Sequence, residues 1–253
     1  MSKVTRYFIG NWKMFGIPSS IKIINRINQY YLKDKKNNKK YKILIAPPHT
    51  LLESFSNKFK NKRIIISAQN CYEKDFYGAY TGSISPFMIR NVGVKHIIIG
   101  HSENRANGET DKILQEKISL AVKNNFNIIF CIGENKTQKI KKQTIKILKK
   151  QISKVIINKN FLKNIIIAYE PVWSIGSGKT PSAKELTNNV KLLKQFIKKR
   201  YKTKKEVKFL YGGSVDGKSI KDFKTTKILD GFLIGGASKS SKKFIDIIKN
   251  FYK

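Results

Sequence analysis

Eight short apolar runs, spaced at regular intervals along the chain, are the feature that most limits its fold. Several are apolar without a break, as at Ile97, Ile98 and Ile99, which is typical of parallel strands buried on both faces. Between the runs, apolar residues recur at helical spacing and lysine fills much of the other face. The predicted strands are residues 7–10, 41–46, 63–68, 96–100, 127–132, 164–168, 207–211 and 231–234.

Two of the intervening segments carry a helix-start signal, the capping box. In this pattern a hydroxyl side chain and a carboxylate three residues later each accept a hydrogen bond from the other's backbone N–H group. Thr50 with Glu53, and Ser182 with Glu185, fit the pattern. We therefore expect helices to begin at Thr50 and at Ser182.

The number of strand–helix units indicates the architecture. Eight units in 253 residues favour the α/β class and a single closed (β/α)8 barrel. An open, doubly wound sheet is also compatible with the periodicity alone. No low-complexity linker interrupts the sequence, so we expect one catalytic domain over residues 1–253.

The formal net charge of +36 raises the question of nucleic-acid binding. The lysines are spread over nearly all predicted helices and are not interleaved with aromatic residues on one segment, as a stacking surface requires. The chain is also rich in Ile and Asn, which share A/T-rich codons with Lys. We therefore interpret the charge as codon drift at solvated positions and expect no specific nucleic-acid partner.

Cysteine content and hydropathy indicate the compartment. Cys71 and Cys131 are the two cysteines, and neither belongs to a metal-binding pattern, which suits a reducing environment. No run is long enough for a membrane span, and the N-terminal segment lacks the apolar core of a signal peptide. We expect a cytoplasmic protein without a membrane partner.

The chemically distinctive side chains follow the predicted strands. Asn11 and Lys13 come after the first run, His101 and Glu103 after the fourth, and Glu170 after the sixth. In a barrel of parallel strands these positions meet at one end, where active sites form. A lysine, a histidine and a glutamate there could act as charge stabiliser, electrophile and base.

Glycines after the last strands suggest an anion site. Gly176, Gly213, Gly235 and Gly236 would let backbone N–H groups approach a phosphate, and a short helix after Gly236 would add its positive end. Each glycine alone could equally be a turn residue. Residues 177–180 end like a nucleotide-binding P-loop, but Trp173 stands where that loop needs glycine, so we expect no nucleotide cofactor.

Eight short motifs carry a resemblance to one enzyme family. Each is weak alone, but their order and spacing make the combination specific. They are Gly10-Asn11-Trp12-Lys13-Met14, Ala68-Gln69-Asn70-Cys71, Tyr80-Thr81-Gly82, Ile99-Gly100-His101-Ser102-Glu103, Cys131-Ile132-Gly133-Glu134, Ala168-Tyr169-Glu170-Pro171-Val172-Trp173, Tyr211-Gly212-Gly213-Ser214 and Gly231-Phe232-Leu233-Ile234-Gly235-Gly236-Ala237. With them the chain resembles the triosephosphate isomerases over essentially its whole length.

The resemblance implies an enzyme of glycolysis and gluconeogenesis that interconverts D-glyceraldehyde 3-phosphate and dihydroxyacetone phosphate through an enediolate. Glu170 would be the base, and His101 the electrophile that shuttles protons between the substrate oxygens. Lys13 would stabilise charge, Asn11 would bond near the same oxygens, and Glu103 would support Lys13. No metal and no cofactor are implied.

The resemblance also implies substrate contacts and a moving segment. Residues 171–180, here called the lid, would close over the substrate and exclude water. The substrate-binding set would be Asn11, Lys13, Gly176, Ser214, Leu233, Gly235 and Gly236. His49, His96 and Cys131 are interpreted as structural.

A homodimer is implied as well, through the loop of residues 71–85, which includes Cys71, Tyr80, Thr81 and Gly82. Two positions depart from the family pattern, because Ser83 and Asn104 replace the acidic residue and the arginine that form an ion pair between subunits. Both are neutral, so neither leaves an unpaired charge. Phe15 replaces a residue that is usually polar. We expect a dimer that is weaker than usual.

The same residues bear on three other functions, those of an aldolase, a metal-dependent epimerase and an inactive barrel that binds nucleic acid. An aldolase would need a Schiff-base lysine inside a strand, and a metal-dependent epimerase would need His and Asp ligands; neither set is evident. A catalytically inactive barrel that binds nucleic acid is disfavoured by the intact Lys13, His101 and Glu170.

Overall fold

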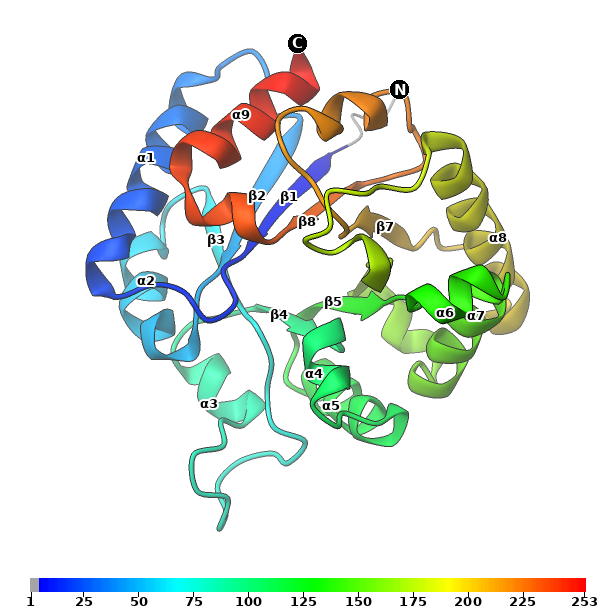
Figure 1. Cartoon of the computed structure of the whole chain (residues 1–253). Coiled ribbons are helices and arrows are strands. Elements are labelled where there is room, and N and C mark those ends of the chain that lie inside the picture. Colours follow the sequence, from blue (N-terminus) through cyan, green and yellow to red (C-terminus); the bar gives the residue numbers. More distant parts are fainter. Residues whose placement is uncertain (1–4) are drawn as a thin grey trace.

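Eight parallel strands form a closed barrel in the computed structural model, which describes residues 5–253 (Figure 1). The strands follow one another around the barrel in chain order, and β1 pairs with β8 to close it. They are β1 (Arg6–Asn11), β2 (Tyr41–Ala46), β3 (Ile64–Ala68), β4 (His96–Ile99), β5 (Asn127–Ile132), β6 (Ile165–Tyr169), β7 (Lys208–Tyr211) and β8 (Gly231–Ile234). The barrel prediction is confirmed, and no predicted strand end moves by more than one residue.

Helices surround the barrel on its outer side (Figure 1). They are α1 (Ile21–Lys33), α2 (Leu52–Phe59), α3 (Pro86–Asn91), α4 (Ser102–Ala106), α5 (Asp111–Lys123), α6 (Lys136–Ile140), α7 (Thr144–Val155), α8 (Ala183–Tyr201) and α9 (Ser241–Tyr252). Between β7 and β8 the connection is a short 3₁₀ helix, Ser219–Phe223. None of the helices described between residues 5 and 253 combines the length and apolarity needed to cross a membrane.

Two apolar cores result from the alternation of side chains along each strand. The inner core fills the barrel and contains Ile9, Leu44, Ile98, Ile129 and Leu210, all buried. The outer core lies between the strands and the helices and is larger. Because side chains fill the barrel interior, open space for a ligand is left only where the strands end.

The two predicted helix starts have different outcomes. The one at Thr50 is wrong, because residues His49–Leu51 form a 3₁₀ turn and α2 begins at Leu52 without a side-chain cap. The Ser182 start is correct, since its hydroxyl accepts the Glu185 backbone N–H at 3.1 Å. The Glu185 carboxylate instead accepts a hydrogen bond from Lys139, outside α8.

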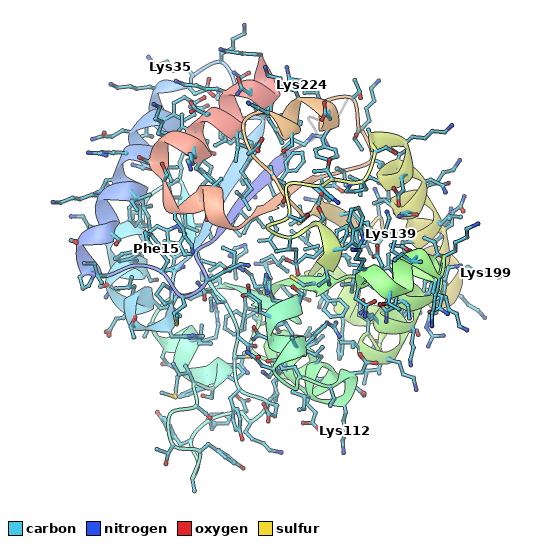
Figure 2. All side chains as sticks on the ribbon, viewed as in Figure 1. Phe15, Lys35, Lys112, Lys139, Lys199 and Lys224 are labelled. Atoms are coloured by element: carbon cyan, nitrogen blue, oxygen red, sulfur yellow. The ribbon has the colours of Figure 1, made fainter. Side chains whose placement is uncertain are left out.

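The lysines lie mostly on the outside of the helices. Figure 2 shows Lys35, Lys112 and Lys199 pointing away from the ribbon on three different sides of the molecule. All three are exposed. This distribution fits charge at solvated positions better than a single basic face. Lys117 is an exception, because it is almost completely buried.

Candidate active site

The strand ends bring the predicted catalytic residues to one cavity. Asn11 ends β1, and Lys13 lies two residues further along the chain. His101 lies two residues after Ile99, the last residue of β4, and Glu170 directly follows Tyr169, the last residue of β6. All four predicted residues line a cavity of about 900 Å³ at the carboxyl ends of the strands.

Glu170 is a carboxylate held in a nearly dry position. Its side chain is only 3% exposed, and its backbone N–H donates to the Ile132 carbonyl oxygen at 2.7 Å. Burial raises the pKa of Glu170 above its ordinary value, against the lowering effect of His101 and Cys131. Gly212 leaves room for the side chain, because a Cβ atom there would lie 2.7 Å from Glu170 Cγ.

His101 faces Glu170 and has its tautomer set by the chain. It caps α4, where its Nδ1 atom accepts the backbone N–H of Glu103 at 3.2 Å. In the neutral ring the proton is therefore on Nε2. That atom lies 3.4 Å from Oε1 of Glu170. A proton donor and a base thus stand side by side at the cavity wall.

Lys13 is positioned by an unusual backbone conformation. Its φ of 56° lies in the left-handed region, which residues other than glycine rarely adopt and which often marks a functional position. Its N–H donates to Asn11 Oδ1 at 3.0 Å, and its carbonyl oxygen accepts from Gln69 at the same distance. Its ammonium donates to Glu103 Oε1 at 2.5 Å.

Glu103 balances the charge of Lys13. Burial by itself would raise the pKa of Glu103, but the hydrogen bond from Lys13 and the charges of His101, Lys13 and Lys239 lower it overall. The carboxylate therefore stays ionised near neutral pH and holds the ammonium at the cavity. Lys239 was not singled out in the sequence, since nothing in its spacing distinguishes it from other surface lysines.

The residues predicted to hold the phosphate border the same cavity as Glu170. Gly213, Ser214, Leu233, Gly235 and Gly236 all line the cavity. The segment after Gly235 is a 3₁₀ helix, Gly236–Lys239, so only a short helical end points there. No atom lies within 4 Å of the place where a Gly236 Cβ would stand, which leaves its backbone accessible to a ligand.

The lid is tied to the strand ends by hydroxyl groups. Ser174 Oγ donates to the Lys179 carbonyl oxygen at 2.6 Å and lies 3.0 Å from the Tyr211 hydroxyl. Ser214 Oγ donates to the Ser174 carbonyl oxygen at 2.8 Å. Gly176, near the tip, lines the cavity and has no neighbour within 4 Å of its Cβ position.

Cys131 and Arg105 lie beside the site and were not predicted as parts of it. Burial, followed by the charge of Glu170, raises the pKa of the Cys131 thiol well above its ordinary value, so it packs as a thiol. Arg105 donates to the carbonyl oxygens of Gly100 at 2.9 Å and Cys131 at 3.1 Å. It therefore ties the ends of β4 and β5 together. No pattern in the sequence marks either contact.

The remaining histidines lie away from the cavity. His49 Nε2 contacts the Asn70 carbonyl oxygen at 2.9 Å. His96 begins β4 at the other end of the barrel, where burial, Lys42 and Lys95 lower its pKa to about 4. Lys208 also starts a strand at that end and donates to Tyr7. Within residues 5–253 no group of three or more His, Cys, Asp or Glu side chains could hold a metal ion.

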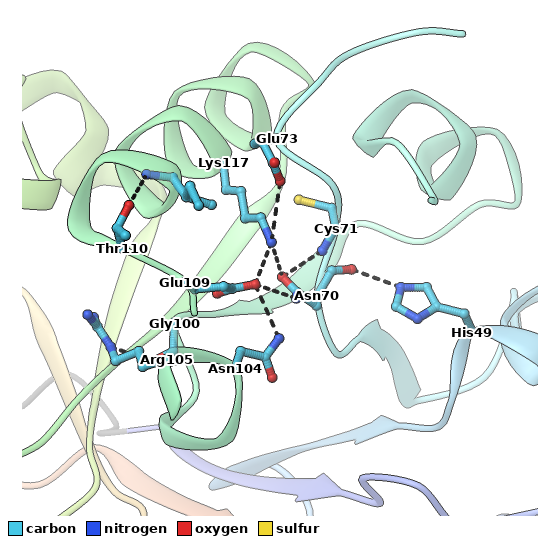
Figure 3. A network of polar contacts seen from close by, with 11 residues as sticks. His49, Asn70, Cys71, Glu73, Gly100, Asn104, Arg105, Glu109, Thr110 and Lys117 are labelled. Carbon is cyan, nitrogen blue, oxygen red and sulfur yellow. Dashed lines mark hydrogen bonds and ion pairs between the residues drawn. The ribbon is translucent and has the colours of Figure 1, made fainter. Parts of the chain in front are cut away.

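A buried polar cluster supports the loop between β3 and α3. Figure 3 shows the Lys117 ammonium between Glu109, Glu73 and Asn70. Asn70 Nδ2 donates to Glu109 Oε1 at 2.7 Å. Asn104 also donates to this oxygen, at 3.3 Å. The cluster thus fixes the beginning of the loop, at Asn70 and Glu73, against α5 and the segment before it.

The loop itself projects from the barrel (Figure 1). Cys71 at its root is buried, whereas Tyr80, Thr81 and Gly82 are exposed. Met14, on the neighbouring loop after β1, is 99% exposed. The Phe15 ring, in contrast, packs against the Trp12 ring of the same chain, with the ring centroids 5.7 Å apart.

The site combines a buried carboxylate, a histidine whose neutral ring carries its proton on Nε2, and a lysine. These groups face glycine-rich loops at the end of a (β/α)8 barrel. They are typical of an acid–base enzyme for small phosphorylated substrates. This class includes isomerases that move a proton beside a carbonyl group.

Comparisons with known proteins identify the family. The family model described as triosephosphate isomerase matches residues 6–251, and the chain belongs to this family. It is 39% identical over 251 residues to the triosephosphate isomerase of Buchnera aphidicola subsp. Cinara cedri, covering 95% of this chain and 96% of the relative. The enzyme of Geotalea uraniireducens is 37% identical over 246 residues, with the same coverage.

A solved structure agrees with the fold. The triosephosphate isomerase of Bartonella henselae superposes with a TM-score of 0.87 at 30% sequence identity, covering 98% of this chain and 99% of that one. The sequence-based predictions of family and fold are therefore confirmed.

Proposed function

We propose that this chain interconverts D-glyceraldehyde 3-phosphate and dihydroxyacetone phosphate by proton transfer through an enediolate. The observation that carries the proposal is the pair formed by Glu170 and His101, whose Oε1 and Nε2 atoms lie 3.4 Å apart at the wall of the cavity. Membership of the triosephosphate isomerase family supports the choice of substrate.

Glu170 takes a proton from the carbon beside the carbonyl group and returns it to the neighbouring carbon. Its burial strengthens it as a base, because the ionised form is poorly solvated. His101 donates its Nε2 proton toward the carbonyl oxygen and passes protons between the two substrate oxygens. Lys13 and Asn11 stabilise the negative charge that develops on these oxygens, and Glu103 holds Lys13 in place.

The phosphate group is held by backbone N–H groups and by the lid. Gly235 and Gly236 line the same cavity as Ser214, Leu233 and the base, where Lys13 and Lys239 would help to neutralise an anion. Closure of residues 171–180 brings Gly176 to the phosphate and keeps water from the enediolate. Without closure, the enediolate would be free to lose its phosphate.

Isomerisation coupled to a reporter dehydrogenase tests the proposal on wild type and Glu170→Gln. We expect fast turnover in wild type and a loss of several orders of magnitude in the variant, since the amide cannot accept the proton. Circular dichroism and thermal unfolding of both proteins establish that the variant is folded. A folded wild type without turnover would refute the function and leave the fold intact.

We also propose a homodimer formed by the projecting loop, with Thr81 placed near the partner subunit's Asn11. The exposed side chains of Met14, Tyr77 and Tyr80 give that side of the molecule an apolar surface that a second copy would cover. Asn104 bonds within its own chain, so the interface forms without an ion pair to Ser83. A monomer in sedimentation at micromolar concentration would refute the dimer.

The proposed compartment is the cytoplasm, with no specific nucleic-acid partner. The buried, unpaired thiols of Cys71 and Cys131 suit a reducing environment. The scattered lysines predict only weak RNA binding at low salt that disappears near physiological salt. Binding that persists at physiological salt would contradict this assignment.

A further inference from the structure

The main chain around Glu170 is held by the three residues that follow Cys131 in β5 and the loop after it. The backbone N–H of Glu170 donates to the Ile132 carbonyl oxygen at 2.7 Å. Two residues further on, the backbone N–H of Val172 donates to the Glu134 carbonyl oxygen at 3.0 Å. The position of the base therefore depends on how firmly this short segment is itself fixed.

Gly133, the middle residue of the segment, is in direct contact with the base. A Cβ atom at Gly133 would stand 1.9 Å from the Glu170 carbonyl oxygen, so the two main chains touch there. The register of β4 and β5 ends at Ile99 and Phe130, before Gly133 is reached. The N–H and C=O groups of Gly133 must therefore find partners outside the neighbouring strand.

The side chain of Gln151 on α7 (Thr144–Val155) is the partner of both groups. Its Oε1 atom accepts the Gly133 N–H at 2.9 Å, and its Nε2 atom donates to the Gly133 carbonyl oxygen at 3.0 Å. The amide thus bonds to Gly133 as the backbone of a further strand would. Since α7 packs against β5, these two bonds tie the helix to the loop at the end of the strand.

Gln151 and the base also border a common space. Besides the large cavity, Glu170 lines a second cavity of about 270 Å³, together with Gly133, Arg105 and Gln151. Within residues 5–253, Oε2 of Glu170 is buried without a hydrogen-bond partner. The carboxylate is therefore oriented by its main chain and by packing more than by bonds to this oxygen, so a shift of the main chain moves it.

We infer that Gln151 is a positioning residue for the catalytic base: its amide holds Gly133 and, through it, the main chain of Glu170. The inference rests on the proposed function, because that function makes Glu170 the base. Gln151 acts through Gly133, so its loss displaces the carboxylate and leaves the residues that hold the substrate in place. The loss is therefore expected to lower kcat more than it changes KM.

Two substitutions separate the hydrogen bonds from the bulk of the side chain. Gln151→Met keeps nearly the same length and volume but removes both bonds to Gly133. We expect kcat about 10- to 100-fold below wild type, with KM within about twofold. Gln151→Glu keeps the acceptor for the Gly133 N–H and loses the donor, so its kcat should lie between the other two. The coupled isomerisation assay measures all three proteins.

The pH profile of Gln151→Met reports on the base itself. The titratable and charged groups near the Glu170 carboxylate are His101, Cys131, Lys13 and, at the second cavity, Arg105, and the variant retains all of them. Burial is the main cause of the raised pKa of Glu170. A displaced carboxylate contacts more water, so the acid limb of kcat/KM is expected to move to lower pH. A loss of stability alone would leave the limb where it is.

Ile152, the next residue on α7, provides a matched control. Its side chain is completely buried in the outer core. Ile152→Ala is expected to unfold at a lower temperature than wild type, with kcat and the acid limb unchanged. Equal kcat in wild type and Gln151→Met, or an equal loss of kcat in Ile152→Ala, would overturn the inference. A folded wild type without turnover would instead count against the proposed function.

Discussion

The Nε2 atom of His101 lies 3.4 Å from Oε1 of Glu170, and both side chains are almost completely buried. Because both groups are buried, the pKa of the Glu170 carboxyl depends strongly on desolvation and on the neighbouring imidazole. Burial raises the pKa of Glu170, so the base is protonated at a higher pH than an exposed glutamate would be.

The first prediction concerns pH. Because the ionised carboxylate is the base, kcat/KM is expected to fall as the pH drops through the raised pKa of Glu170, with an acid limb above the ordinary glutamate value of about 4.3. A pH profile of kcat/KM measures this limb. An acid limb at or below the ordinary glutamate value would contradict the desolvated base.

The same shift has a consequence for stability. A carboxyl group whose pKa is raised by folding binds its proton more tightly in the folded state, so ionisation destabilises the fold as the pH rises through that pKa. We therefore expect Glu170→Gln to unfold at a higher temperature than wild type at neutral pH, with the difference shrinking below the pKa. Thermal unfolding across a pH series measures both values. A constant difference at all pH values would point to packing instead.

A second prediction uses the close approach of Gly212 to the base. In Gly212→Ala the new Cβ atom would meet Glu170 Cγ at 2.7 Å, so the carboxylate must shift. We expect kcat to fall about 100-fold, since a displacement of about 1 Å at a reacting group has effects of that size. Steady-state kinetics and circular dichroism test this. Full activity in the folded variant would show that the carboxylate tolerates the shift.

A third prediction compares two isoleucines. Ile129 is completely buried in the inner core, whereas Ile140 on α6 is 70% exposed. Ile129→Ala is expected to lower the free energy of unfolding by about 2–5 kcal/mol through lost burial and a cavity. Ile140→Ala is expected to change it by less than about 0.5 kcal/mol. Denaturant unfolding of both variants measures the difference, and equal effects would contradict the assignment of the inner core.

A fourth prediction concerns the buried ion pair of Lys117 and Glu109 (Figure 3). Lys117→Met leaves the Glu109 carboxylate buried with only neutral donors, which is expected to cost about 3–5 kcal/mol of stability. Adding Glu109→Gln to that variant removes the uncompensated charge and should recover part of the loss. Urea unfolding of the single and double variants measures this. An equally unstable double variant would show that shape, not charge, determines the cost.

The strands and the site were predictable from sequence for different reasons. The β4 run 96–100 and its neighbours are apolar on both faces, a pattern that short-range sequence alone reveals. Lys13, His101 and Glu170 could be grouped because parallel strands all end on one side of a barrel. Both arguments need only the order of elements and no knowledge of side-chain contacts.

Contacts between distant segments were not predictable in this way. The start of α2 was misplaced because the turn at His49 depends on how the chain leaves β2, which the four-residue capping pattern does not describe. The contacts of Arg105 with Cys131 and of Lys139 with Trp173 depend on which carbonyl oxygen or ring comes within reach after folding. One lysine among many has no sequence feature that distinguishes it, so such partners follow only from the folded structure.

The pairing of β1 with β8 constrains how the barrel can fold during translation. On one side, residues 7–10 of β1 pair with β2, and on the other side they pair with residues 231–234 of β8. Near this seam the Trp12 indole also donates to the carbonyl oxygen of Ser238, 226 residues further along the chain. During synthesis β1 therefore keeps one edge unpaired until the residues of β8 have left the ribosome. An open edge of this kind is a template for pairing with another nascent chain. Protection of that edge while translation proceeds is thus a requirement of the closed barrel itself.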